Sequence, residues 1–251
     1  MILGHDATIA RFLDAWRSGA MHHAWLLTGP RGIGKASFAQ FAATRMLAEA
    51  AGPPIAEPGL STPDTHPTAH LIAAGSHPDY RFLERVENKT GTALARNISV
   101  DQVRSLGNLF SVTPAMSDWR VVVIDAADDL EASAANALLK MLEEPPAKCV
   151  FLLVSHVPGR LLPTIRSRCR MLAFQPLGDD VMASVLAEQG QDPAKIPALI
   201  QRAGGSPGTA LSYAALDLAP LLDQALAIMR HGDPVNERRS KLAQSFALKA
   251  S

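Results

Sequence analysis

Apolar residues recur along this chain in two alternating patterns. Short runs of consecutive apolar residues favour buried strands, and spacings of three and four residues favour helices. The segment "HAWLLTG" at 23–29 is such a run. Residues 7–18 have the helical spacing instead, with apolar side chains at Ile9, Phe12, Leu13 and Trp16. Because runs and helical segments continue to alternate, the sequence predicts an α/β fold with a parallel sheet in three layers.

The remaining elements of this layout follow from the same two patterns. Further strands are predicted at 79–86, 119–125, 149–155 and 170–174, and helices at 35–50, 99–110, 131–144 and 161–169. Ser99 is in position to cap the helix at 99–110, and Pro145 with Pro146 end the helix at 131–144. Residues 52–77 are rich in Pro, Gly, Ser, Thr and His, which predicts an irregular surface insertion.

The strand pattern stops after Gln175 and Pro176. Short helices are expected over 178–217, and a further helical segment is expected from Pro220 to Ser251. The chain is therefore divided into an α/β domain at 1–176, a small helical domain at 177–217 and a helical segment at 218–251.

Composition narrows the class of protein. The 251 residues are 47% hydrophobic with a net charge of zero, so DNA contact has to come from a local patch rather than from bulk positive charge. Two cysteines, Cys149 and Cys169, have no metal-ligand spacing and make a disulfide framework unexpected. No signal peptide is recognised, and no apolar run reaches the roughly 18 residues that span a membrane. A cytoplasmic protein without membrane contact is expected.

The stretch "GPRGIGKAS" between a predicted strand and a predicted helix has the spacing of a phosphate-binding loop. Glycines let successive backbone N–H groups wrap phosphates, and the lysine reaches the β- and γ-phosphates. The alternative is a Gly-rich turn in an unrelated α/β protein. The candidate nucleotide-binding residues of this stretch are Gly29, Pro30, Gly32, Gly34, Lys35, Ala36 and Ser37.

The position after the lysine departs from the phosphate-loop pattern. It normally carries a hydroxyl that binds Mg²⁺, and here it is Ala36. Ser37 follows, but one step along a helix rotates a side chain by about 100°, so Ser37 is a poor substitute. The first metal ligand is therefore predicted to be missing, and no metal site is assigned.

The run "VVVIDAADDL" supplies the second acid of such a pocket and a second defect. Asp125 ends an apolar strand, where it fits a metal-binding carboxylate, although a strand-end Asp can also cap the next turn. Ala126 stands where a general base would activate water, and losing such a base costs about 10²–10⁴-fold in rate. Asp128 and Asp129 are expected to be solvated. The pocket is predicted not to hydrolyse ATP, and whether ATP or ADP binds without hydrolysis is left open.

Several ordered segments carry a family resemblance. They are "HAWLLTGPRGIGK", "GSHPDYRFLE", "SVDQVRSL", "NALLKMLEEPP", "LLVS" and "LLPTIRSRC". Over about residues 5–215 the chain resembles the clamp-loader branch of the AAA+ proteins, and within it the delta-prime family of bacterial DNA polymerase III. The resemblance implies an AAA+ P-loop domain at 1–176, a helical lid at 177–217 and the start of a helical collar at 218–251.

The resemblance also implies roles for single residues. Arg168, between Ser167 and Cys169, falls on the family's arginine finger, which reaches the ATP site of a neighbouring subunit. Ser155, at the end of "FLLVS", falls on the sensor position beside the phosphate. By itself the cluster of Arg166, Arg168 and Arg170 would be read as surface charge.

Three features depart from the family pattern. The zinc module normally has four cysteines, but the segment between the loop helix and "HPDY" has none. His66, His70 and His77 remain without partners at ligand spacing, so no zinc is expected. Thr209 in "GGSPGTAL" replaces the lid arginine that reads phosphate. With about thirty residues after Pro220, an incomplete collar is expected.

These expectations combine into one functional prediction. The chain would be a non-hydrolysing subunit of the DNA polymerase III holoenzyme, itself a DNA-directed DNA polymerase. It would join motor ATPase subunits and the delta subunit in a heteropentameric ring that loads the sliding clamp on primer–template DNA. The alternatives are an active motor ATPase of the same ring, a small-molecule P-loop kinase or GTPase, and a nucleotide-binding scaffold outside replication.

Overall fold

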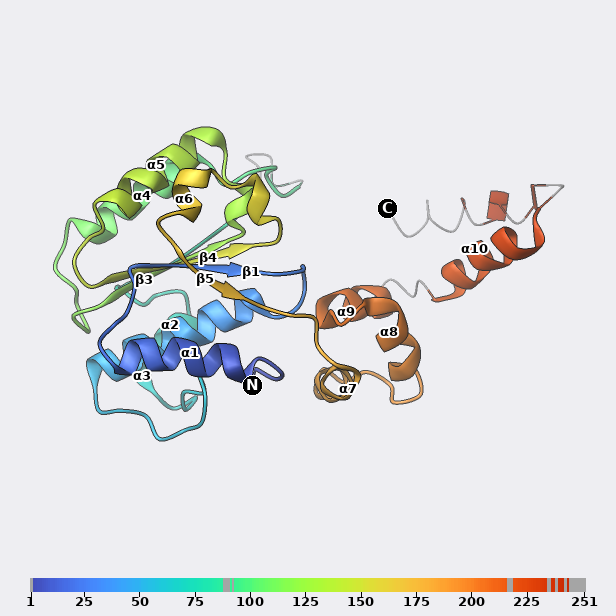
Figure 1. Ribbon diagram of the computed structural model, residues 1–251, viewed down its shortest axis with the longest axis horizontal. Helices are drawn as coiled ribbons and strands as arrows, with labels where there is room; N and C mark the ends of the chain where they lie inside the picture. Colours follow the sequence, from blue (N-terminus) through green and yellow to red (C-terminus); the bar gives the residue numbers. More distant parts are fainter. Residues whose placement is uncertain are drawn as a thin grey trace. The chain divides into compact units, whose positions relative to one another are not determined.

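A computed structural model describes residues 2–87, 91, 93–215, 219–233, 236–237, 239–241 and 243. The chain divides into two compact units, Met1–Gln175 and Pro176–Ser251. The first unit is a five-stranded parallel sheet between two layers of helices (Figure 1). The predicted α/β fold with a parallel sheet is therefore confirmed.

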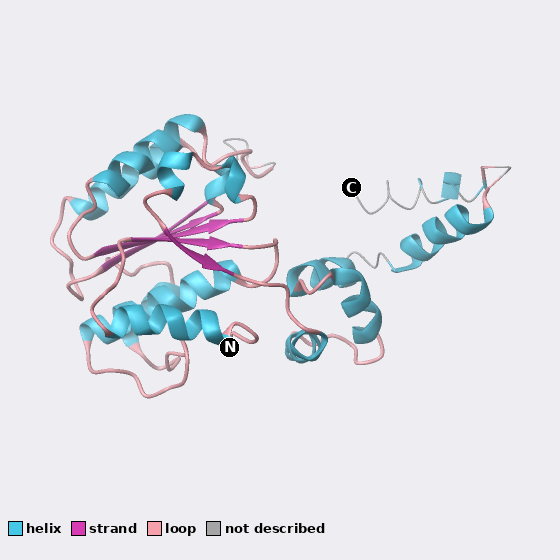
Figure 2. Cartoon of the chain, viewed as in Figure 1, coloured by secondary structure: helices cyan, strands magenta, loops and turns pink. Residues whose placement is uncertain are grey.

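The sheet, drawn in magenta in Figure 2, has the strand order β2-β3-β4-β1-β5. The strands are β1 (Ala24–Thr28), β2 (Tyr80–Glu84), β3 (Arg120–Asp125), β4 (Cys149–Ser155) and β5 (Arg170–Ala173). Every residue of the neighbouring strands β1 and β4 is buried, which explains their unbroken apolar sequence. Each predicted strand is found; the one expected over 79–86 is limited to β2.

Helices cover both faces of this sheet (Figure 1). One layer consists of α1 (Asp6–Arg17), α2 (Lys35–Ala51) and α3 (Pro67–Ala73), and the other of α4 (Val100–Phe110), α5 (Ala132–Glu143) and α6 (Pro163–Arg166). Successive strand residues point to opposite faces. Trp25 and Leu27 therefore join the core under α1 and α2, while Leu26 joins the core under α4 and α5.

The start of α4 confirms the predicted cap. Ser99 Oγ accepts a hydrogen bond from the Gln102 amide, and the Gln102 side chain accepts one from the Ser99 amide at 3.0 Å. This reciprocal arrangement satisfies two backbone donors that the helix itself leaves open. The cap fixes where α4 begins after the segment that follows β2.

The insertion at 52–77 is more ordered than its sequence predicts. It contains α3 and buries Leu60 and Thr68. Arg45 of α2 is fully buried, and its guanidinium donates to the carbonyl oxygens of three residues of the insertion, Ile55, Glu57 and Ser61. The expected irregular surface insertion is found over 52–66, and it is corrected at α3. The sequence also did not reveal the anchoring by Arg45, because composition does not show which backbone acceptors a buried cation gathers.

The second unit begins with three short helices, α7 (Asp179–Glu188), α8 (Ile196–Ala203) and α9 (Pro207–Ala215). They enclose a small core that includes Met182, Leu186 and Ala210. A further helix, α10 (Ala219–His231), covers part of the segment expected from Pro220 onward. Residues 216–218, at the expected boundary, and 244–251 lie outside the described residues, so the lid and collar assignments stay predictions.

Candidate functional site

Three segments that are distant in sequence meet at the carboxyl edge of the sheet. The neighbouring strands β3, β4 and β1 end at Asp125, Ser155 and Thr28, and Thr28 pairs with Ser155. The loop "GPRGIGKAS" follows β1 directly. The fold thus brings the predicted loop, the predicted acid and the predicted sensor serine to one place. Carboxyl ends of parallel strands are where α/β proteins bind ligands.

Backbone conformation explains two glycines of the loop. Gly29 has φ 145°, and a Cβ there would lie 2.4 Å from the Phe174 carbonyl oxygen. Gly34 has φ 98° and stands at the N-cap of α2, where a left-handed conformation favours glycine. His5 also holds the loop, through a hydrogen bond of 2.8 Å between its Nε2 and the Ile33 carbonyl oxygen. The loop is therefore held by its own protein scaffold.

Lys35 is turned toward the loop. Its Nζ donates to the carbonyl oxygens of Gly29 at 2.6 Å and Pro30 at 2.5 Å, and the residue is only 2% exposed. Burial lowers the pKa of Lys35 from 10.5 to about 8, although Asp125 and Asp128 attract the proton. Two of the three N–H donors of the ammonium group are thus taken up by backbone acceptors of its own loop, and a phosphate would have to share the group with them.

The two alanines of the candidate pocket, Ala36 and Ala126, lie on different elements. Ala36 follows Lys35 in the first turn of α2, and Ser37 is exposed one step further. Ala126 is buried directly after Asp125. Burial and the nearby Glu84 carboxylate raise the pKa of Asp125, and Lys35 opposes that shift. The pocket retains the Asp125 carboxylate and the Lys35 ammonium group, but it has no hydroxyl at 36 and no acid at 126.

Asp128 was wrongly expected to be solvated. It is half-buried, and its carboxylate accepts hydrogen bonds from Ser155 Oγ at 2.7 Å, from the His156 amide and from the Val157 amide at 3.2 Å. Ser155 is fully buried and its hydroxyl cannot reach water, so Asp128 provides the hydrogen-bond acceptor that this hydroxyl requires. Asp129 is also engaged, in an ion pair of 3.1 Å with Arg85. The sequence could not distinguish Asp128 from Asp129, because the two residues are adjacent and identical. The conformation of the turn at 127–129 decides which contacts each side chain makes.

The predicted finger, Arg168, lies two residues after the end of α6. Its Nη2 forms an ion pair with Glu143 Oε1 at 3.0 Å, and its Nη1 donates to the Thr164 carbonyl oxygen at 3.0 Å. The other two arginines of the cluster differ from it. Arg170 stacks over the Trp25 ring at 5.1 Å, and Arg166 is exposed. Glu143 is a contact that sequence reasoning missed, because 25 residues separate it from Arg168.

Arg168 lies near the amino ends of the strands, and the loop lies at their carboxyl ends. Arg168 comes two residues before β5, whose first residue, Arg170, pairs with Trp25 near the start of β1. The loop follows Thr28 at the other end of β1. A strand of this length spans roughly 16 Å. The structure therefore does not bring Arg168 to the pocket of its own chain.

A comparison with known protein families identifies the family of this chain. Residues 4–178 match the family described as "DNA polymerase III, delta subunit". The chain belongs to this family.

Individual relatives of the DNA polymerase III delta-subunit family give the same result. DNA polymerase III subunit delta' of Pseudomonas aeruginosa is 38% identical over 224 residues, which are 88% of this chain and 60% of that protein. Subunit delta' of Bacillus subtilis is 34% identical over 69% of this chain and 48% of its own length. Subunit gamma/tau of Mycobacterium tuberculosis is 34% identical over 90% of this chain and 36% of its own. The predicted resemblance to the delta-prime family is confirmed, and the chain spans 60% or less of each of these relatives.

The histidines and the lid threonine of this family member have local contacts. His66 Nδ1 accepts from the Thr68 amide at the start of α3, and His77 Nδ1 accepts from the Asp79 amide. Within the described ranges, no three His, Cys, Asp or Glu side chains gather as metal ligands. Thr209 lies in the first turn of α9, where its amide donates to Ser206 Oγ. The expectations of no zinc and of a lost lid contact stay predictions.

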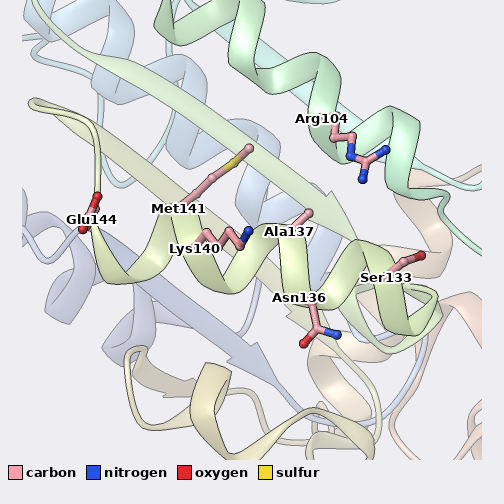
Figure 3. Close-up of a pocket in the computed structure, with 7 residues that line it drawn as sticks. All are labelled: Arg104, Ser133, Asn136, Ala137, Lys140, Met141 and Glu144. Carbon is pink, nitrogen blue, oxygen red and sulfur yellow. The ribbon is translucent and has the colours of Figure 1, made fainter.

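A recess of about 550 Å³ lies between α4 and α5 (Figure 3). It is lined by Arg104, Ser133, Asn136, Ala137, Lys140, Met141 and Glu144. None of the predicted nucleotide-binding residues lines it. No described helix of this family member is long and apolar enough to cross a bilayer.

Proposed function

We propose that this chain acts as a clamp-loader subunit of DNA polymerase III that does not hydrolyse ATP itself. It joins motor ATPase subunits and the delta subunit in a cytoplasmic hetero-oligomeric ring. In that ring it supplies Arg168 to the ATP site of a neighbour and so helps to load the sliding clamp on primer–template DNA. Membership of the delta-subunit family supports this assignment.

The state of the pocket supports the absence of hydrolysis. Lys35 donates two hydrogen bonds to its own loop, and the positions that would bind Mg²⁺ and activate water carry Ala36 and Ala126. A positioned general base contributes about 10²–10⁴-fold, and a metal ion neutralises charge on the transferred phosphoryl group. Losing both at once leaves a pocket in which a nucleotide, if bound, is not turned over.

The observation that carries the proposal is the placement of Arg168 at the sheet edge opposite the loop. A guanidinium roughly 16 Å along the strands cannot contact a phosphate held by its own loop. At that end of the strands the Arg168 side chain is half-exposed. An arginine finger given to another subunit needs this arrangement, since it has to project from a surface.

One comparison favours a second candidate, an active motor ATPase. The chain is 34% identical to a gamma/tau subunit over 90% of its length, nearly as close as to the delta' relatives. A motor subunit needs a hydroxyl at position 36 and an acid at position 126, and both positions are alanine here. The non-hydrolysing assignment is therefore preferred.

A phosphate-release assay on the purified protein distinguishes the two candidates. We expect negligible turnover with or without primed DNA, and no change in Lys35→Ala, because the pocket lacks a metal ligand and a base. Turnover of about one per second that Lys35→Ala abolishes would establish the motor ATPase instead. Gln40→Ala is the control for an unspecific change in α2, because Gln40 is exposed and lies outside the loop.

A further inference from the structure

Arg168 is held in a retracted pose in this chain. The acceptor of its Nη1 is the carbonyl oxygen of Thr164, four residues earlier, so the side chain folds back along its own short helix. Its Nη2 is bound by Glu143, the last residue of α5. Both terminal nitrogens of the guanidinium are therefore occupied within the chain.

The same two nitrogens are the donors that a phosphate requires. Guanidinium groups recognise carboxylates and phosphates through the same planar fork of N–H groups. A carboxylate on Nη2 consequently competes with any phosphate for that donor. Arg168 has to release Glu143, and to leave Thr164, before it can extend its fork to another subunit.

The pair is built to exchange rather than to be permanent. The Arg168 and Glu143 side chains are 35% and 44% exposed, so water can replace either partner. Arg45 of the same unit provides the contrast. Its side chain is fully buried and has Glu49 and three backbone carbonyls as acceptors, so it has no route to another ligand. Exposure distinguishes a reversible partner from a structural one.

We infer that Glu143 is a positioning residue that holds Arg168 in a retracted state until the neighbouring ATP site draws the guanidinium away. This inference rests on the proposed role of Arg168. Glu143 touches no substrate and acts through Arg168 alone. Its effect is a brake on the rate of hydrolysis at the neighbour's site.

The test uses a reconstituted ring that contains this protein as Glu143→Gln. Gln keeps the shape of the side chain but removes the charge that competes for Nη2. We expect kcat for ATP hydrolysis by the ring, without clamp or DNA, to rise roughly two- to fivefold with KM unchanged, which matches the strength of an exposed pair. Glu144→Gln is the matched control, because it removes the same charge one residue further along. Rings are matched by sizing and thermal midpoint first.

Parallel variants separate this inference from the proposed function. Arg168→Ala should slow the ring, and Glu143→Gln with Arg168→Ala should be as slow as Arg168→Ala alone. If Arg168→Ala slows the ring but Glu143→Gln equals Glu144→Gln, the retraction is refuted and the finger stands. A slower Glu143→Gln ring refutes it too, since Glu143 would then present the arginine. If Arg168→Ala changes nothing, the finger and the inference built on it both fall.

Discussion

Two cations of this chain have opposite environments. Lys35 at the phosphate loop is 2% exposed and donates to two carbonyl oxygens of its own loop. Arg168 at the other edge of the sheet is 35% exposed and has one exposed carboxylate as its ionic partner. Lys35 is enclosed by groups of its own loop, whereas Arg168 is held by an exposed ion pair that can change partners. The chain therefore has a buried cation in its candidate pocket and an exchangeable cation at the opposite end of the sheet.

Asp128 holds the start of the segment that leads from the candidate pocket to Arg168. It fixes Ser155 and the amides of His156 and Val157 at the end of β4, beside the loop. The chain then runs through α6 to Arg168 at the far edge. The segment between the pocket and the arginine is thus anchored at its start by a carboxylate of the protein rather than by a ligand.

The largest expected effect comes from removing Arg168. In a ring, Arg168→Ala should slow the dependent ATP site by about 10³–10⁵-fold, because a finger neutralises developing phosphate charge. The total rate falls less where other sites work normally. Clamp- and DNA-stimulated hydrolysis and clamp loading are measured in rings of matched assembly.

Arg166→Ala is the control for this experiment, since Arg166 is an exposed arginine of the same segment. If Arg168 only pairs with Glu143, its loss costs at most about 1 kcal/mol of stability and leaves the ring rate unchanged. Equal ATP hydrolysis rates for the two variants would therefore show that Arg168 does not act on a neighbouring ATP site.

A smaller effect is expected from breaking the anchor between the regions. Asp128→Ala removes three hydrogen bonds to a carboxylate and leaves the buried Ser155 hydroxyl without an acceptor. The free energy of unfolding should fall by about 2–4 kcal/mol. Asp129→Ala, which loses a partly exposed pair with Arg85, should cost no more than about 1 kcal/mol. Urea unfolding measures both, and equal losses would contradict the anchoring role of Asp128.

The smallest effect is a pH dependence at Lys35. Its folded pKa of about 8 lies below the ordinary value of 10.5, so the unfolded chain binds more protons between these two values. The contribution of Lys35 to the free energy of unfolding should therefore rise as pH increases from 8 to 10.5, by roughly 2 kcal/mol. Unfolding is compared with Lys35→Met near pH 7.5 and pH 9.5. A difference between the two proteins that does not change with pH would show that burial of Lys35 is not costly.

Local sequence patterns were sufficient for the elements of the first unit. The apolar runs of β1, β3 and β4 can only be satisfied inside a sheet that is covered on both faces, so their positions were predictable. The cap by Ser99 was also predictable, since a cap is a local contact, and the structure adds Gln102, three residues later, as its reciprocal partner. The insertion at 52–77 was not, because the acceptors that Arg45 gathers are separated from it by 10 to 16 residues.

The candidate site shows the same division. Glycine spacing, the strand-end acid and the two alanines are properties of single positions, and the sequence by itself determined them together with the family. Only the tertiary structure decided that Lys35 turns to its own loop, that Asp128 and not Asp129 binds Ser155, and that Arg168 folds back onto Glu143. The physical reason is that each of these side chains could form the same type of hydrogen bond or ion pair with several residues. Residue type cannot make that choice; it follows from which side chains the packed sheet and helices place within about 3 Å of one another.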